Sequence, residues 1–132
     1  MKWMTIGALA AMMAASAWAQ SESDYQGYMK TVFATNGSMQ KNVTAKSADA
    51  AADAKKLQDT FKMVEAFWKG RGADDAVGFA QKAQAVAGMV ASDVAGGDFD
   101  KAAADAKSIG MVCGGCHMAH REGAAGSFHI KQ

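Results

Sequence analysis

The residues most capable of chemistry in this 132-residue chain are its two cysteines and a neighbouring histidine. They form the run Cys113-Gly114-Gly115-Cys116-His117. Side chains three and four positions apart share one face of a helix, so both thiols can face one ligand while the imidazole points towards its centre. The spacing Cys-x-x-Cys-His is typical of covalent haem attachment. The run therefore predicts one haem c, attached through Cys113 and Cys116, with His117 as the proximal iron ligand.

Two other kinds of site also use a Cys-x-x-Cys pair. A dithiol redox centre usually stands at the start of a helix beside a sheet, and the sequence shows no βαβ pattern. A structural zinc site needs four ligands, and His120 and His129 are nearby but form no second pair at suitable spacing. The sequence favours haem attachment over both alternatives.

The N-terminal residues have the pattern of a secretory signal peptide. Lys2 precedes an apolar run, and the small residues of Ala17-Trp18-Ala19 mark a cleavage point. A retained membrane anchor is the alternative, although the run is short for a bilayer span. We expect residues 1–19 to be removed and residues 20–132 to form one exported domain. Export delivers the chain to the periplasm, the compartment where bacteria attach haem covalently.

The composition favours helices and gives no sign of a nucleic-acid surface. The chain is 50% hydrophobic and 20% charged, and it contains no proline. Alanine is abundant and β-branched residues are sparse, so helix is the most favourable state for most of the chain. Without Lys2, thirteen basic side chains balance thirteen acidic ones, and neither sign gathers in a block. A core so rich in alanine favours a bulky cofactor that fills the interior.

Apolar residues recur at helical spacing in four segments that small or helix-breaking residues separate. The expected helices are 22–44, 48–69, 74–95 and about 98–123. Ser21 and Ser23 are candidate caps of the first helix, and the haem motif lies on the last. Similar helix lengths and short connections predict an all-α, antiparallel up-down four-helix bundle with its haem near the C-terminus. The tail after Ala124 shows no clear pattern.

Methionine is the expected ligand on the other face of the iron. In an up-down bundle, the start of the first helix lies level with the end of the fourth. Met29 is roughly 10 Å into the first helix and His117 roughly 9 Å from the end of the last, at 1.5 Å per residue. Met39 lies too far along the first helix to be level with His117, and Met89 is excluded for similar reasons. Met63 lies off the apolar stripe of its helix, and that helix is diagonally opposite the last one. The alternative for Met29 is flexible core filler.

These features together resemble the class II c-type cytochromes, the cytochrome c-prime family, and in particular its low-spin, methionine-ligated branch. Residues 102–121 match the last helix of that four-helix family. The family usually continues the motif with tyrosine and arginine, whereas this chain has Met118-Ala119-His120-Arg121, with His120 where tyrosine is common. Alignment through Gly37-Ser38-Met39 places Met29 at the distal haem position.

The expected function is one-electron transfer by a periplasmic monohaem carrier that is not an enzyme. Histidine and thioether ligands favour ferrous iron and leave little room for a gas. The alternative is a five-coordinate or ligand-switching protein that binds nitric oxide or carbon monoxide. A peroxidase is disfavoured, because no distal histidine and arginine arrangement is present.

The remaining expectations concern residues around the haem and the partners of the protein. Arg121 is expected to pair with a haem propionate or to close the last helix through its charge. His120 is expected to border the haem and His129 to be exposed. Packing against the haem or the bundle core is expected of Tyr25, Tyr28, Phe33 and Trp68. The expected partners are redox proteins of unknown identity. We expect no binding of nucleic acid and no stable membrane insertion after cleavage of the signal peptide. The resemblance also implies a possible homodimer.

Overall fold

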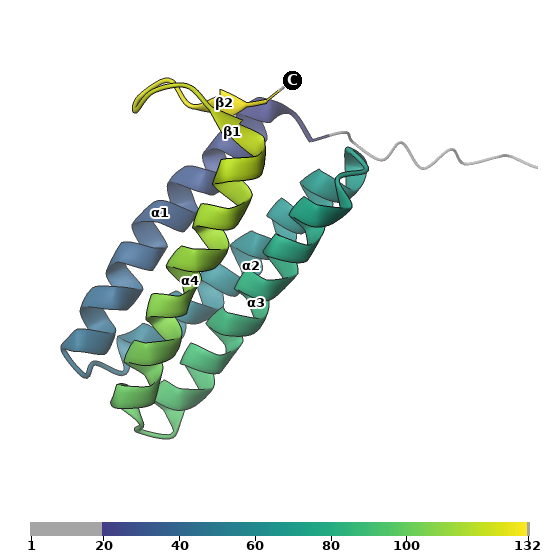
Figure 1. The fold of residues 1–132 in the computed structure, drawn as a ribbon. Helices are drawn as coiled ribbons and strands as arrows, with labels where there is room; N and C mark the ends of the chain where they lie inside the picture. Colours follow the sequence, from purple (N-terminus) through teal and green to yellow (C-terminus); the bar gives the residue numbers. More distant parts are fainter. Residues whose placement is uncertain (1–19, 132) are drawn as a thin grey trace, which may run out of the picture.

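The computed structural model describes residues 20–131, which form a bundle of four α-helices followed by a short hairpin (Figure 1). The helices are α1 (Glu22–Thr44), α2 (Asp49–Gly70), α3 (Asp74–Ala95) and α4 (Phe99–His120). The hairpin pairs β1 (Arg121–Glu122) with β2 (His129–Ile130). This confirms the all-α class and the four helices, while the predicted signal peptide, residues 1–19, lies outside the described residues. Within residues 20–131, no helix has the length and apolar character needed to cross a bilayer.

The helix boundaries follow from caps that the sequence contains. The Ser21 hydroxyl accepts a hydrogen bond from the Asp24 N–H at 3.1 Å, and the Asp24 carboxylate accepts one from the Ser21 N–H at 3.0 Å. This reciprocal capping box starts α1. Asp98 caps α4 by accepting from the Lys101 N–H at 3.0 Å. Gly97 between α3 and α4 has a φ of 76°, a left-handed conformation that glycine adopts without strain.

The core runs along the inside of the bundle. One apolar stripe along α2 is entirely buried and consists of Ala50, Ala54, Leu57, Phe61, Val64 and Trp68. Met39 of α1 is fully buried in this core. Fully buried alanines on α3 and α4, among them Ala83 and Ala106, let the helix backbones approach closely.

Each helix packs against the next in sequence, and α1 also packs against α4. The packing between α1 and α4 is the thinnest of these neighbouring pairs. Near the end of α1, the Gln40 side-chain amide donates to the Ala106 carbonyl of α4 at 2.7 Å. At the start of α1, the Glu22 carboxylate accepts a hydrogen bond from the Ile130 N–H at 3.0 Å. Polar contacts therefore join α1 to α4 near the end of α1, and join the start of α1 to the hairpin that follows α4.

The C-terminal tail differs from the expectation. The helix predicted to run to about residue 123 ends at His120, and the chain then reverses into the hairpin. Arg121 pairs with Ile130 in this hairpin, and Gly123 adopts a φ of 102° where the chain turns. Ile130 is buried, so the hairpin is anchored to the bundle. The tail thus covers one end of the space between α1 and α4.

Candidate functional site

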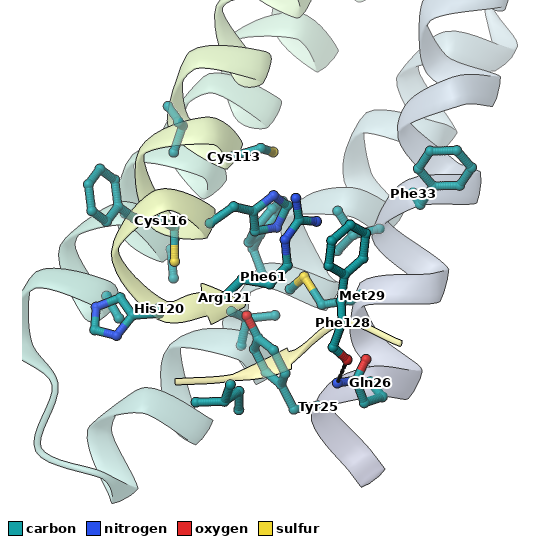
Figure 2. A pocket seen from close by; sticks show the side chains of 18 of the residues that line it. Tyr25, Gln26, Met29, Phe33, Phe61, Cys113, Cys116, His120, Arg121 and Phe128 are labelled. Carbon is teal, nitrogen blue, oxygen red and sulfur yellow. Dashed lines mark hydrogen bonds between the residues drawn. The ribbon is translucent and has the colours of Figure 1, made fainter. Parts of the chain in front are cut away.

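A pocket of about 550 Å³ opens between α1 and α4, where the packing is thinnest (Figure 2). Its volume lies within the range of roughly 300–1,000 Å³ typical of small-molecule and cofactor sites. All four helices and the hairpin contribute to its walls, which are mainly apolar. Apolar lining side chains include Val32, Phe61, Val64, Ala80 and Ile130. Such walls favour a bulky apolar ligand over a small polar one.

All five predicted site residues line this pocket. Cys113, Cys116, His117 and Arg121 reach it from α4 and β1, and Met29 reaches it from α1. Figure 2 shows the Met29 side chain facing the side of the pocket that carries the two cysteines. The structure therefore brings Met29 and Cys113, which are 84 positions apart in the sequence, to one pocket.

The two cysteines are free thiols that the pocket partly buries. Burial raises the pKa of Cys113, and it raises the pKa of Cys116 to about 11, with a smaller contribution from the negative charge of Asp75. A dithiol redox centre needs a readily formed thiolate. The raised pKa values keep both thiols neutral at neutral pH, which disfavours that alternative.

His117 is half-buried beside the cysteines. Burial lowers the pKa of the imidazole, and the nearby positive charge of Arg121 lowers it further. The neutral imidazole therefore predominates at neutral pH, and this is the form that binds a metal ion.

The two glycines between the cysteines have different surroundings. A Cβ added at Gly115 would lie 2.7 Å from Cε1 of Phe79 on α3, which is closer than two carbon atoms can pack. A Cβ added at Gly114 would meet nothing within 4 Å. Gly115 is therefore needed for the packing of α4 on Phe79, a reason that the sequence alone did not reveal.

Among residues 20–131, Met29 is the only methionine that lines the pocket. It is partly buried and packs against the core. Met39 lies inside the core, while Met63 and Met89 are exposed on α2 and α3. Of Met29, Met39, Met63 and Met89, only Met29 therefore reaches the pocket.

The other two histidines have carboxylate partners. His120 lines the pocket, but its Nε2 lies 2.8 Å from the Asp75 carboxylate and its ring packs at 4.7 Å on that of Trp68. His129 is exposed as expected, and its Nε2 lies 3.1 Å from the Glu122 carboxylate. These contacts hold α4 against α3 and close the hairpin.

Two pocket residues were not predicted as functional. Tyr25 is only 7% exposed, and Figure 2 shows its hydroxyl directed into the pocket. Phe128 lies in the tail, where its ring packs under the Arg121 guanidinium at 3.8 Å and its carbonyl accepts from the Gln26 side chain at 3.1 Å. No pattern in the sequence points to Phe128, whereas Tyr25 lies four positions before Met29 on the same helical stripe.

No family model, no curated protein and no solved structure matches this chain. Within the described part of the chain, no three His, Cys, Asp or Glu side chains gather closely enough to hold a metal ion by themselves. The thiols, imidazole and thioether around this apolar pocket fit a haem.

Proposed function

We propose that this chain is a periplasmic monohaem c-type cytochrome that transfers single electrons between redox proteins and is not an enzyme. The observation that carries the proposal is the convergence of two thiols, an imidazole and a thioether on one mainly apolar pocket. The proposal includes an antiparallel up-down order of the helices. The hydrogen bond from Ile130, after the end of α4, to Glu22, at the start of α1, supports this order.

Cys113 and Cys116 would hold the haem through two thioether bonds. Both side chains reach the pocket from one helix face, and burial keeps them protonated until attachment. When bound, the haem supplies an iron that changes reversibly between Fe(III) and Fe(II) by one electron. Two covalent bonds to α4 would keep the group in the pocket.

His117 and Met29 would bind the iron from opposite sides of the pocket. The lowered pKa of His117 keeps its imidazole neutral and able to coordinate. The Met29 thioether, a soft ligand, would favour Fe(II) and raise the reduction potential. The apolar side chains of Phe61 and Val64 line the same space and would help to keep water from the iron. These features suit electron transfer better than catalysis.

Arg121 would bind a carboxylate of the haem at the edge of the pocket. Its guanidinium lies over the Phe128 ring and keeps its charge next to the space between α1 and α4. A guanidinium makes strong, often bidentate hydrogen bonds with carboxylates. Phe128 therefore supports the position of Arg121.

Export of the chain agrees with this chemistry. Residues 1–19 have the pattern of a cleavable signal peptide, and covalent haem attachment in bacteria follows export. The proposed location is the periplasm, without stable membrane insertion after cleavage.

The first test is covalent attachment in the purified, processed protein. Haem should stay with the chain through denaturing electrophoresis, and the Cys113→Ser/Cys116→Ser double variant should lose it. Release of all haem from the wild-type chain under these conditions would overturn the proposal.

Carbon monoxide tests the second candidate, a gas-binding haem protein. One observation favours this candidate: α1 packs thinly on α4, so Met29 can withdraw without disturbing the core between α2 and α3. Electron transfer predicts sharp ferrous absorption bands that carbon monoxide leaves unchanged. A ready spectral response to carbon monoxide would support gas binding and remove the assignment of Met29 as a stable ligand.

A further inference from the structure

The charges of this molecule balance overall but are segregated in the fold. Ten of the thirteen acidic residues lie between Asp49 and Asp105, whereas α1 after Asp24 and α4 after Asp105 contain none. The lysines and arginines of these stretches are Lys30, Lys41 and Lys107, all exposed. Lys46 follows α1, and Arg121 follows α4 together with the acidic Glu122; all three are exposed. The two helices that border the pocket therefore present positive charge alone over most of their length.

Large apolar side chains are exposed on the same two helices. Phe33 on α1 is 83% exposed and lines the pocket, and Figure 2 shows it at the pocket edge. Met111 and Met118 on α4 are 82% and 81% exposed, and their spacing of seven positions puts them on one helix face. Met63 and Met89, on α2 and α3, are only about half as exposed, at 46% and 45%. Exposed apolar side chains with a charged rim mark interaction sites.

We propose that this surface, the docking face, binds a redox protein whose own surface carries acidic side chains around an apolar centre. The docking face consists of Lys30, Phe33, Lys107, Met111, Met118 and Arg121. The proposal rests on the proposed function, because the partner would exchange its electron with a haem held between α1 and α4. Opposite charges would steer the encounter, and the apolar centre would exclude water from the short-lived contact.

Charge complementarity selects this partner over a second copy of the chain. Two copies that met through their docking faces would bring lysine and arginine side chains together without any carboxylate from those stretches of α1 and α4. Like charges across an interface oppose association. An acidic surface on another protein removes this repulsion and gains attraction from the same groups.

The first experiment does not depend on haem. Amide chemical shifts of the full, processed protein are mapped with poly-L-glutamate as an acidic probe. Shifts should concentrate around Lys30 and Lys107 and disappear as ionic strength rises from about 10 mM to about 200 mM. The Lys30→Glu/Lys107→Glu variant should lose them, and the matched Lys56→Glu/Lys82→Glu variant on α2 and α3 should keep them. Shifts spread evenly over all four helices would overturn the proposal.

The same mapping is repeated with vesicles of anionic phospholipid. Vesicle binding through Phe33 and Met118 that persists at about 200 mM salt would overturn the protein partner in favour of a membrane surface. Absence of vesicle binding at that salt concentration supports the proposal.

The second experiment measures electron transfer from the reduced holoprotein to two small oxidants of opposite charge. Oxidation by hexacyanoferrate(III) should slow as salt increases, and oxidation by tris(phenanthroline)cobalt(III) should accelerate. At about 10 mM ionic strength, Lys30→Glu/Lys107→Glu should slow the anionic oxidant by roughly tenfold, and Lys56→Glu/Lys82→Glu by much less. Equal effects of the two variants would overturn the docking face as the route of the electron. A preparation without covalent haem would overturn the proposed function instead, while the shift mapping would still test the surface.

Discussion

Met29 is the one proposed iron ligand that can be replaced without altering the attachment motif. Leucine has a similar volume and lacks sulfur, and such a swap usually costs less than about 1.5 kcal/mol. We predict that Met29→Leu folds, has a lower reduction potential and gains a response to carbon monoxide. Absorption spectra and redox titration measure both effects. The control is Met63→Leu at an exposed position of α2, which should behave as wild type. Wild-type spectra in Met29→Leu would contradict thioether ligation.

Tyr25 should make the free energy of unfolding depend on pH in the alkaline range. Burial raises the pKa of its hydroxyl from the ordinary value of 10.0 to about 12. Between these values the unfolded chain has lost the proton that the folded chain keeps, so rising pH favours unfolding. The expected loss from this group is roughly 1.4 kcal/mol per pH unit. Urea unfolding across this range should show a steeper decline for wild type than for Tyr25→Phe. Parallel pH profiles would contradict this account.

The sequence predicted the residues whose spacing is fixed by chemistry. Cys113, Cys116 and His117 follow from the attachment motif, and Met29 follows from its height along a helix. The direction of the Tyr25 hydroxyl was not predictable, because it depends on a side-chain rotamer and on how the neighbouring helices pack. Phe128 was missed because its position depends on Gln26, which is 102 residues away in the chain.

At the scale of elements, local signals decided what could be predicted. Each helix repeats its apolar residues over several turns, and Ser21 and Asp98 supply caps. The hairpin has two residues in each strand, too few for any periodic pattern. Its anchor is tertiary, through the buried Ile130 and the Glu22 carboxylate. Helices were therefore predictable and the hairpin was not.

The contact between α4 and α3 gives a prediction with a built-in control. Replacement of either motif glycine by alanine favours helix by a similar amount, up to about 1 kcal/mol. Only Gly115→Ala forces a new methyl group against Phe79. We predict that Gly115→Ala is roughly 1–2 kcal/mol less stable than Gly114→Ala. Urea unfolding of both variants measures the difference, and equal stabilities would show that Phe79 moves aside without cost.

At the scale of the whole molecule, packing is uneven between the helix pairs. Contacts between α2 and α3 are the most extensive and those between α1 and α4 the thinnest. We predict that amide hydrogen exchange is slower in α2 and α3 than in α1. Covalent haem should then slow exchange in α1 and α4 most, relative to the Cys113→Ser/Cys116→Ser variant. Equal protection of all four helices in that variant would contradict the expected gradient.

The overall charge balance of the sequence concealed the charge distribution of the fold. The thirteen acidic and thirteen basic side chains of residues 20–132 suggest no preferred partner. The acid-free stretches lie near opposite ends of the chain, and only the packing of α1 beside α4 joins them into one surface. Net charge could not predict this asymmetry, because it depends on which segments become neighbours.

Trp68 gives this protein an optical reporter of its own folding. It is the only tryptophan in residues 20–131, and it is buried beside Tyr25, Phe67 and His120. Its fluorescence should therefore come from a single, apolar environment in the native state and shift to longer wavelength when the bundle opens. Energy transfer to the proposed haem should quench this emission, so one unlabelled side chain can report both cofactor attachment and unfolding.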